Sequence, residues 1–206
     1  MQVLKEDIKL KIINTAKEEF FNKGYKNTSM RTISKKSNVG LSNIYNYFLS
    51  KDNILKEVLS KLLHAIESQF KKHHSTESLS LNIFNDSEYI KSHRNDITYM
   101  IKEYKKEFKL LLFHCYGSSF ENFRESYTEW STKEGLSYLK KINELHHNKK
   151  INTEVSPFFI RTMSSWWLTT IGEIVLDDDL SDESIDKFIT EYMVFATAGW
   201  KKLIDA

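Results

Sequence analysis

Residues 28 to 55 carry the feature that most constrains the fold of this chain. The stretch TSMRTISKKSNVGLSNIYNYFLSKDNIL reads as two short helices around a tight turn, with a third helix behind them. Asn38 falls where the chain must reverse, and asparagine tolerates left-handed backbone angles better than most residues. Gly40 then opens the next helix. The segment therefore predicts a helix-turn-helix near the N-terminus.

The two short helices each have one apolar side. Thr28 can accept hydrogen bonds from free N–H groups of the helix that it starts, and Met30 and Ile33 give that helix a buried face. After the turn, a helix from 41 to 48 would turn apolar positions to one side, namely Leu41, Ile44, Tyr45 and Phe48. Polar, uncharged residues occupy its other side, which suits the width of a DNA major groove: Ser42, Asn43 and Asn46.

An upstream helix completes a three-helix unit. Its apolar positions repeat every fourth residue at Ile8, Ile12, Ala16 and Phe20, and Gly24 follows as a C-terminal cap. Three short helices of this kind match the plan in which two helices support a recognition helix in the groove. The alternative at this point is an ordinary helical bundle.

The distribution of charge favours a polyanionic partner for the N-terminal part. Residues 1 to 75 hold 14 Lys and Arg against 7 Asp and Glu, whereas residues 76 to 206 hold 16 against 21. The near-neutral total of +2 hides this asymmetry. Charge runs are often only solvated helix faces, so the excess counts through its coincidence with the helix-turn-helix pattern.

From about Ile8 to Leu59 the chain resembles the TetR/AcrR family of transcriptional regulators, whose tyrosine-rich recognition helix is followed by a Ser-Lys-acid start to helix four. Here that motif reads IYNYFLSKDNIL. The positions that carry the likeness are Phe20, Gly24, Tyr25, Thr28, Ile33, Val39, Tyr45, Tyr47, Phe48 and Lys51. The resemblance implies a ligand-responsive repressor that binds a palindromic operator as a homodimer.

The resemblance also assigns roles in DNA binding. It implies that phosphates are held by the start of helix two, the two tyrosines and the lysine, and that the reading helix specifies sequence. The DNA-binding candidates are Thr28, Ser29, Arg31, Leu41, Ser42, Asn43, Tyr45, Asn46, Tyr47 and Lys51.

Several residues depart from the family pattern. Ser34 stands where the family usually has Ala, Asn38 replaces the usual Gly, and Gly40 replaces a capping Ser or Thr. No charged residue occurs between Ser37 and Ser50, so the reading helix has no Arg or Lys for guanine. Asparagine pairs with adenine, and Tyr or Leu packs on a thymine methyl, so we expect an operator rich in A·T at its contacted positions.

Patterning predicts an all-α chain of about nine helices in two domains. We place a helix-turn-helix domain at residues 1–50 and a larger helical domain for ligand sensing and dimerisation at 51–206. Helix four, from residue 51, connects them through an apolar stripe: Ile54, Leu55, Val58, Leu59, Leu62, Leu63 and Ile66. Residues 73–80 look like a loop.

Further helices follow that loop. Apolar spacing predicts one helical segment from Tyr89 to Phe108 and another from Phe120 to Leu139. Ser156 and Pro157 start a helix that is apolar nearly all round to Leu176, which we expect to be buried. The last helix is predicted from Asp182 to Ile204, with Ser181 as its N-terminal cap.

The last helix has more apolar surface than one core contact needs, and the resemblance implies that the last two helices form a dimer interface. Small residues would permit close helix approach, and a two-fold protein gains specificity from half-sites about 34 Å apart. Intramolecular packing is the alternative. The interface candidates are Phe158, Thr162, Ile185, Tyr192, Phe195, Ala196, Gly199 and Trp200.

Large aromatics and a few polar groups in the second domain could line a pocket for a partly apolar small-molecule effector. Aromatics at helical spacing are more often core. The ligand candidates are Tyr104, His114, Cys115, Tyr116, Phe120, Tyr127, Trp130, Phe159, Arg161, Trp166 and Trp167. By the resemblance, a ligand would shift helix four and change the spacing of the two reading helices.

Other functions find little support. No nucleophile elbow, dinucleotide fingerprint or phosphate loop is present, so we expect neither an enzyme nor a cofactor. The pairs His73-His74 and His146-His147 lack metal-ligand spacing, and we expect no metal. One cysteine excludes an intrachain disulfide, and without a signal or membrane segment we expect a soluble, cytoplasmic protein. The rivals are an interaction protein that has lost DNA binding and a small helical enzyme.

Overall fold

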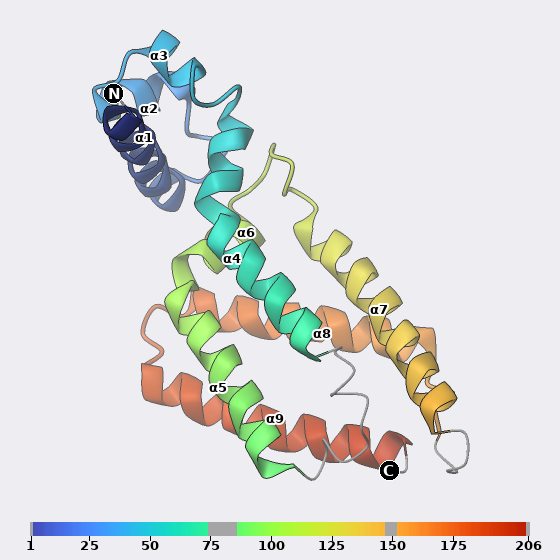
Figure 1. The fold of residues 1–206 in the computed structure, drawn as a ribbon. Coiled ribbons are helices and arrows are strands. Elements are labelled where there is room, and N and C mark those ends of the chain that lie inside the picture. Colours follow the sequence, from blue (N-terminus) through green and yellow to red (C-terminus); the bar gives the residue numbers. More distant parts are fainter. Residues whose placement is uncertain (1, 74–85, 147–151, 205–206) are drawn as a thin grey trace. The chain divides into compact units, whose positions relative to one another are not determined.

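The computed structural model describes residues 2–73, 86–146 and 152–204, and within these ranges the chain forms nine α-helices and no strand (Figure 1). The expected all-α class is confirmed. The chain divides into two compact units. The first comprises Met1–His64 and Lys106–Phe123, and the second comprises Ala65–Lys105 and Arg124–Ala206.

The first unit contains a small helical core. Its helices are α1 (Gln2–Lys23), α2 (Met30–Ser37), α3 (Leu41–Tyr45), the first part of α4 (Lys51–His73) and α6 (Lys105–Phe113). The fully buried side chains of this core come from four helices: Ile12, Ala16, Phe20, Ile33, Ile44, Ile54, Leu55, Leu59 and Leu62. Most apolar positions predicted for the three N-terminal helices are therefore buried, but Ile8, Met30 and Leu41 are only half-buried and Tyr45 is exposed.

Gly24 ends α1 as predicted. Its backbone lies at φ 74°, and its N–H donates to the Phe20 carbonyl at 2.9 Å. The next N–H, that of Tyr25, donates to the carbonyl of His114 at 2.9 Å. A methyl group added at Gly24 would lie 3.3 Å from that same carbonyl oxygen. Glycine is therefore required here for its backbone angle and for the close approach of the residue after α6.

The second unit contains the rest of α4, α5 (Ser87–Glu103), α7 (Phe123–Leu145), α8 (Pro157–Leu176) and α9 (Asp182–Ile204). The Ser156 hydroxyl accepts from the Phe159 N–H at 3.1 Å, and Ser181 accepts from Ser184 in the same way. Both caps were predicted, and α9 has the bounds that the sequence indicated.

One predicted helix is two. The segment from Tyr89 to Phe108 breaks at Tyr104, whose φ of −112° and ψ of 26° leave the helical region. Its N–H still donates to the Met100 carbonyl at 3.1 Å, so α5 ends in a regular last turn before α6 begins. No Gly or Pro marks the break. The second segment also begins later than predicted, because Phe120 precedes α7.

Helices α8 and α9 pack in antiparallel fashion through aromatic side chains. The rings of Trp166 and Phe195 lie 5.9 Å apart, and those of Phe159 and Trp200 lie 5.7 Å apart. On the other side of α8, the Ile160 methyl comes within 3.0 Å of the position of a Cβ on Gly135. A small cluster closes this end of the unit, formed by Leu139, Val155, Ile160 and Ile204.

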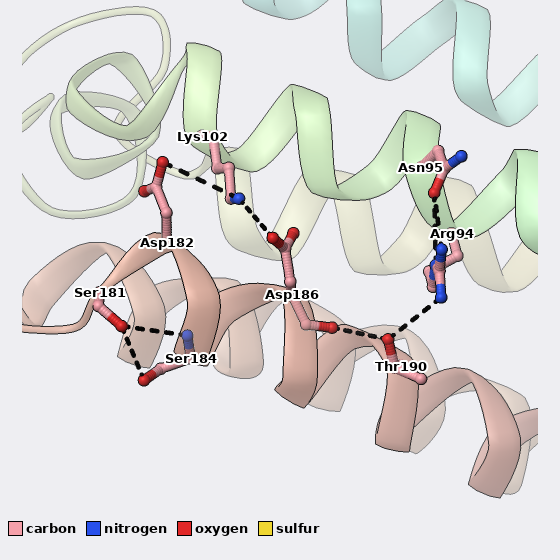
Figure 2. A network of polar contacts seen from close by, with 8 residues as sticks. All are labelled: Arg94, Asn95, Lys102, Ser181, Asp182, Ser184, Asp186 and Thr190. Carbon is pink, nitrogen blue, oxygen red and sulfur yellow. Dashed lines mark hydrogen bonds and ion pairs between the residues drawn. The ribbon is translucent and has the colours of Figure 1, made fainter.

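A polar seam joins α5 to α9 (Figure 2). The Lys102 ammonium lies 2.9 Å from a carboxylate oxygen of Asp186 and 3.9 Å from one of Asp182. Further along, Arg94 donates to the Thr190 hydroxyl at 3.5 Å. Because these groups are partly exposed, each contributes little stability by itself, but together they fix the register of the two helices.

Helix α8 is not buried all round, contrary to expectation. Phe158 is 79% exposed, and Phe159, Trp166 and Leu176 also keep a third or more of their surface exposed. The opposite side is buried through Ile160, Leu168, Ile171, Ile174 and Val175. Among the described residues, one face of this apolar helix thus stays partly exposed.

None of the helices in the described ranges combines the length and the apolar character that crossing a bilayer requires.

Two glycine variants separate backbone strain from packing in the first unit. Gly24 and Gly117 both have positive φ, but only Gly24 has neighbours within 4 Å of an added methyl group. We expect Gly117→Ala to cost about 1 kcal/mol from the backbone angle alone. Gly24→Ala should cost clearly more, because His114 must also move. Urea unfolding measures both values, and equal losses would contradict the packing role of Gly24.

Candidate DNA-binding surface

Helix α2 begins one residue later than predicted. Ser29 is the N-terminal cap, since its hydroxyl accepts from the Thr32 N–H at 3.0 Å. Thr28, which the sequence favoured as the cap, is instead 2% exposed and its hydroxyl donates to the carbonyls of Gly24 and Glu19 at 2.9 and 3.3 Å. The exposed start of α2 is therefore formed by Ser29 and Arg31.

The turn between α2 and α3 has the predicted left-handed residue. Asn38 lies at φ 51° and ψ 37° and is the only residue other than glycine with positive φ among those that the structure describes. The Ser34 hydroxyl donates to the Val39 carbonyl at 2.7 Å, and the Val39 N–H donates to the Ser34 carbonyl at 3.3 Å. The serine that departs from the family pattern thus closes this turn.

The reading helix is shorter than predicted but presents the expected side. Helix α3 ends at Tyr45, and Phe48 continues the turn by donating its N–H to the Ile44 carbonyl at 2.9 Å. Ile44 and Phe48 are buried, whereas Tyr45 is 46% exposed. The exposed residues of the segment also include Ser42 and Asn46, with Leu41, Asn43 and Tyr47 half-buried.

The side chains of Asn43 and Asn46 contact each other in this segment. Their mutual hydrogen bond is long, with 3.4 Å between Asn46 Nδ2 and Asn43 Oδ1. A hydrogen bond of that length is weak. Cations lie outside this neutral segment, with Arg31 and Lys35 exposed on α2. A neutral reading surface flanked by cations suits contact with bases and phosphates together.

The Lys51 side chain is engaged within the unit. Its ammonium donates to the carbonyls of Tyr25 and Thr28 at 2.6 and 2.7 Å and lies 3.8 Å from the centre of the Tyr25 ring. Burial lowers the pKa of this ammonium. The phosphate contact that the resemblance implies for Lys51 stays a prediction.

A buried carboxylate links α1 to α2. Glu19 is 2% exposed and pairs with Lys36 of α2 and, at 3.2 Å, with Lys23 of its own helix. The hydrogen bond from Lys36 lowers the pKa of Glu19 against the opposing effect of burial, and Lys23 lowers it further. The carboxylate is therefore charged at neutral pH and holds the cation of α2 beside α1.

Comparison with known proteins agrees with this geometry. Residues 12–58 match the model of the family described as bacterial regulatory proteins, tetR family. The helix-turn-helix domain is of the TetR family. No curated protein matches the sequence closely enough to be counted as a relative.

Solved structures of bacterial transcriptional regulators share the fold of this chain. A putative TetR-family transcriptional regulator from Syntrophomonas wolfei is 17% identical, with a TM-score of 0.63 over 94% of this chain and 96% of that one. NalD, the secondary repressor of the MexAB-OprM multidrug efflux pump in Pseudomonas aeruginosa, is 14% identical, with a TM-score of 0.61 over 92% and 95%. A transcriptional regulator from Aquifex aeolicus VF5 is 19% identical, with a TM-score of 0.59 over 92% and 99%.

Helix α6 packs within the same unit as the TetR-family helices. Its Glu107 carboxylate is 8% exposed and lies 2.7 Å from the Lys17 ammonium of α1. Beyond α6, the Ser119 N–H donates to Asp52 of α4 at 2.9 Å. Burial raises the pKa of Asp52, but the bonds from Ser119 and the nearby Lys56 outweigh it, so the pKa lies below its ordinary value.

The structure divides the predicted ligand residues between the two units. The first unit holds His114, Cys115, Tyr116 and Phe120, of which His114 and Tyr116 are exposed. Burial raises the pKa of the Cys115 thiol to about 12, so the thiol stays protonated and is a poor redox sensor. The second unit holds Tyr104, Tyr127, Trp130, Phe159, Arg161, Trp166 and Trp167.

Within the second unit, several of the candidates lie in groups of aromatic contacts. Trp130 lies 4.0 Å from Phe70 and 5.6 Å from Tyr127, measured between ring centres, and Trp167 lies 5.1 Å from Tyr192. Burial raises the pKa of both tyrosines, Tyr127 and Tyr192, to about 12. Arg161 is placed differently, because it pairs with Glu125 at 2.6 Å in a partly exposed position.

The predicted interface residues are mostly at the surface of α8 and α9. Phe158, Thr162, Phe195 and Gly199 are exposed, and Tyr192, Ala196 and Trp200 are half-buried. Ile185 is only 1% exposed and belongs to the core of its own chain. Nothing lies within 4 Å of the position of a Cβ on Gly199, so the surface there is open.

The sequence reasoning missed Glu19, although its position gave a signal. Glu19 follows Ala16 by three residues and Ile12 by seven, so it shares their buried side of α1. An acid on an apolar stripe indicates a buried ion pair. The contacts of Glu107 and Asp52 gave no comparable signal.

No cluster of metal-binding side chains occurs in the part of the chain that the structure describes. Of the histidine pairs considered, His74 and His147 lie outside the described residues.

The ion pair of Glu19 predicts a specific dependence of stability on pH. Because its pKa is lowered by folding from 4.5, the stabilisation is fully present above that value and is lost as the pH falls through the folded pKa. We expect Glu19→Gln to lose about 2 kcal/mol at pH 7 and progressively less below pH 4.5. Urea unfolding across this range measures the difference.

The neighbouring Glu18 provides a matched control, since it is exposed on the same helix. Glu18→Gln should change stability by less than about 0.5 kcal/mol at every pH. A loss for Glu19→Gln that does not vary with pH would mean that the charge of Glu19 is unimportant.

Proposed function

We propose that this chain is a ligand-responsive TetR-family repressor that binds a palindromic DNA operator as a homodimer. The observation that carries the proposal is the exposed, uncharged side of α3 and the turn after it, with cations on α2 beside it. A surface without charge gains no electrostatic attraction to phosphates. If this surface contacts DNA, its polar side chains would therefore serve to distinguish bases.

The proposed contacts follow from exposure. Ser29 and Arg31 at the start of α2, with Tyr45 and Tyr47 after the turn, would hold phosphates. Ser42, Asn43 and Asn46 would contact base edges, and Leu41 would pack on a thymine methyl. Since asparagine pairs best with adenine, the contacted positions of the operator should be rich in A·T.

The apolar stripe of α8 and α9 supports dimerisation. This stripe consists of exposed or half-buried side chains on two adjacent antiparallel helices, namely Phe158, Thr162, Trp166, Phe188, Phe195 and Gly199. Val194 beside it is 67% exposed. Exposed apolar surface spread along two helices is typical of a site covered by another protein, and a second copy would place two reading helices on one operator.

The groups of aromatic contacts in the second unit support a partly apolar, ring-containing effector. Phe70, Trp130 and Tyr127 are in ring contact across α4 and α7, and Trp167 contacts Tyr192 across α8 and α9. Burial raises the pKa of both tyrosines, so each would contribute a neutral phenol to an effector site. The effector would act by binding more tightly to the conformation that does not fit the operator.

Selection from a random duplex library tests DNA reading directly. We expect the purified chain to enrich palindromic sites with A·T at the contacted positions, with affinity that falls steeply as salt rises. Asn43→Ala should weaken binding to the selected site about 10-fold to 100-fold and relax the preference at one position of each half-site. Asn22→Ala, an exposed change on α1, is the control and should have no effect.

Two results of this selection would reject the proposal. Enrichment of sites dominated by G·C would reject the A·T-directed reading. Absence of any selective retention would favour a protein that interacts through the same scaffold without binding DNA.

A single charge in the apolar stripe tests the dimer. We expect the wild-type chain to sediment as a dimer at micromolar concentration and Phe195→Glu to sediment as a monomer, because the carboxylate would be buried without a partner. Tyr99→Glu on α5 is a matched control, since Tyr99 and Phe195 are both 64% exposed. A monomeric wild type, or equal effects of the two changes, would contradict the proposal.

A further inference from the structure

The turn between α1 and α2 is held by a lysine that is distant in sequence. Residues 25 to 28 form this turn, in which the Thr28 N–H donates to the Tyr25 carbonyl at 3.2 Å. The Lys51 ammonium, at the start of α4, donates to that same carbonyl at 2.6 Å and to the Thr28 carbonyl at 2.7 Å. One cation thus bonds the carbonyls at both ends of the turn.

The ammonium of Lys51 also lies against an aromatic ring. Its nitrogen lies 3.8 Å from the centre of the Tyr25 ring, and Tyr25 itself is 7% exposed. An ammonium has three protons, and here two are given to carbonyls while the ring attracts the charge. The half-buried Lys51 side chain therefore already has three partners within the unit, two carbonyls and a ring.

The opposite side of the turn is fixed by Thr28. Its buried hydroxyl donates to the carbonyls of Gly24 and Glu19, at the end of α1. The carbonyl of the same residue is bonded to Lys51, so Thr28 is held from α1 and from α4 together. The residue that follows directly is Ser29, the cap of α2, with Arg31 two residues later.

We propose that Lys51 is a positioning residue: its ammonium orients the turn of residues 25–28, and thereby the exposed start of α2, and does not itself bind a phosphate. This inference rests on the proposed function, because it concerns how the unit contacts DNA. It replaces the role that the family resemblance implies for Lys51. The phosphate contacts then fall to exposed groups such as Ser29 and Arg31.

The dependence of affinity on salt distinguishes the two roles. Each phosphate contact made by a cation adds about 0.9 to the slope of log affinity against log salt, whereas a positioning residue adds nothing. On the selected operator, we expect Lys51→Met to weaken binding about 10-fold through misplaced contacts, with the slope unchanged. Arg31→Gln should lower the slope by about 0.9 per half-site.

A milder variant guards against simple unfolding. Lys51→Gln removes the charge but keeps an N–H donor, so its affinity should lie between those of wild type and Lys51→Met, again with the wild-type slope. Far-UV circular dichroism at the assay temperature establishes that each variant is folded. A slope lowered by about 0.9 per half-site in both Lys51 variants would overturn the proposal, as would unchanged affinity in folded Lys51→Met.

Amide hydrogen exchange tests the same inference without DNA. Lys51→Met should speed exchange at residues 26–32 and leave the amides in the middle of α9 unchanged. Unaltered exchange at residues 26–32 would overturn the positioning role. If the wild-type chain retains no DNA at all, the proposed function fails by itself, and the exchange measurement still decides whether Lys51 holds the turn.

Discussion

The carboxylate of Glu19 lies almost completely inside the protein, and a buried charge needs an opposite charge beside it. Lys36 supplies that charge from α2, and Lys23 adds a second from α1. This ion pair adds to the burial of Ile33 in holding α2 beside α1. Since the turn at Asn38 is tightly bonded, fixing α2 also fixes where α3 begins.

In the first unit, the cations and the uncharged segment proposed to contact bases lie on different parts of the chain. Its cations stand on α1, α2 and α4, and several of them, including Lys36 and Lys51, are occupied in holding the unit together. The segment from α3 to Phe48 carries no charge. Such a surface gains specificity only when it is placed accurately, because polar contacts to bases depend strongly on distance and angle. A neutral recognition helix therefore depends on being held rigidly in place.

Local signals determined which parts of this architecture were predictable from sequence. The starts of α8 and α9 were predicted well, because each has a clear local signal. These signals are Ser156 followed by Pro157, and Ser181 before an acidic first turn. No Gly or Pro near Tyr104 marks the division into α5 and α6, so the residue pattern did not indicate it.

At the start of α2, Thr28 and Ser29 are both good caps by residue type. Only the burial of Thr28 against α1 decides between them. The assignment of roles within the DNA-binding unit was harder still to predict, because Lys51 meets the carbonyls of Tyr25 and Thr28 only after the chain has folded back on itself.

All four tryptophans of the chain, Trp130, Trp166, Trp167 and Trp200, belong to the second unit. Three of them stack on aromatic neighbours from α4, α7 or α9, and Trp200 contacts α8. Indole emission is sensitive to such surroundings, while the helix-turn-helix contributes only tyrosine and phenylalanine. The natural tryptophan fluorescence of the protein is therefore an internal optical probe of the second unit alone, which needs neither a label nor DNA.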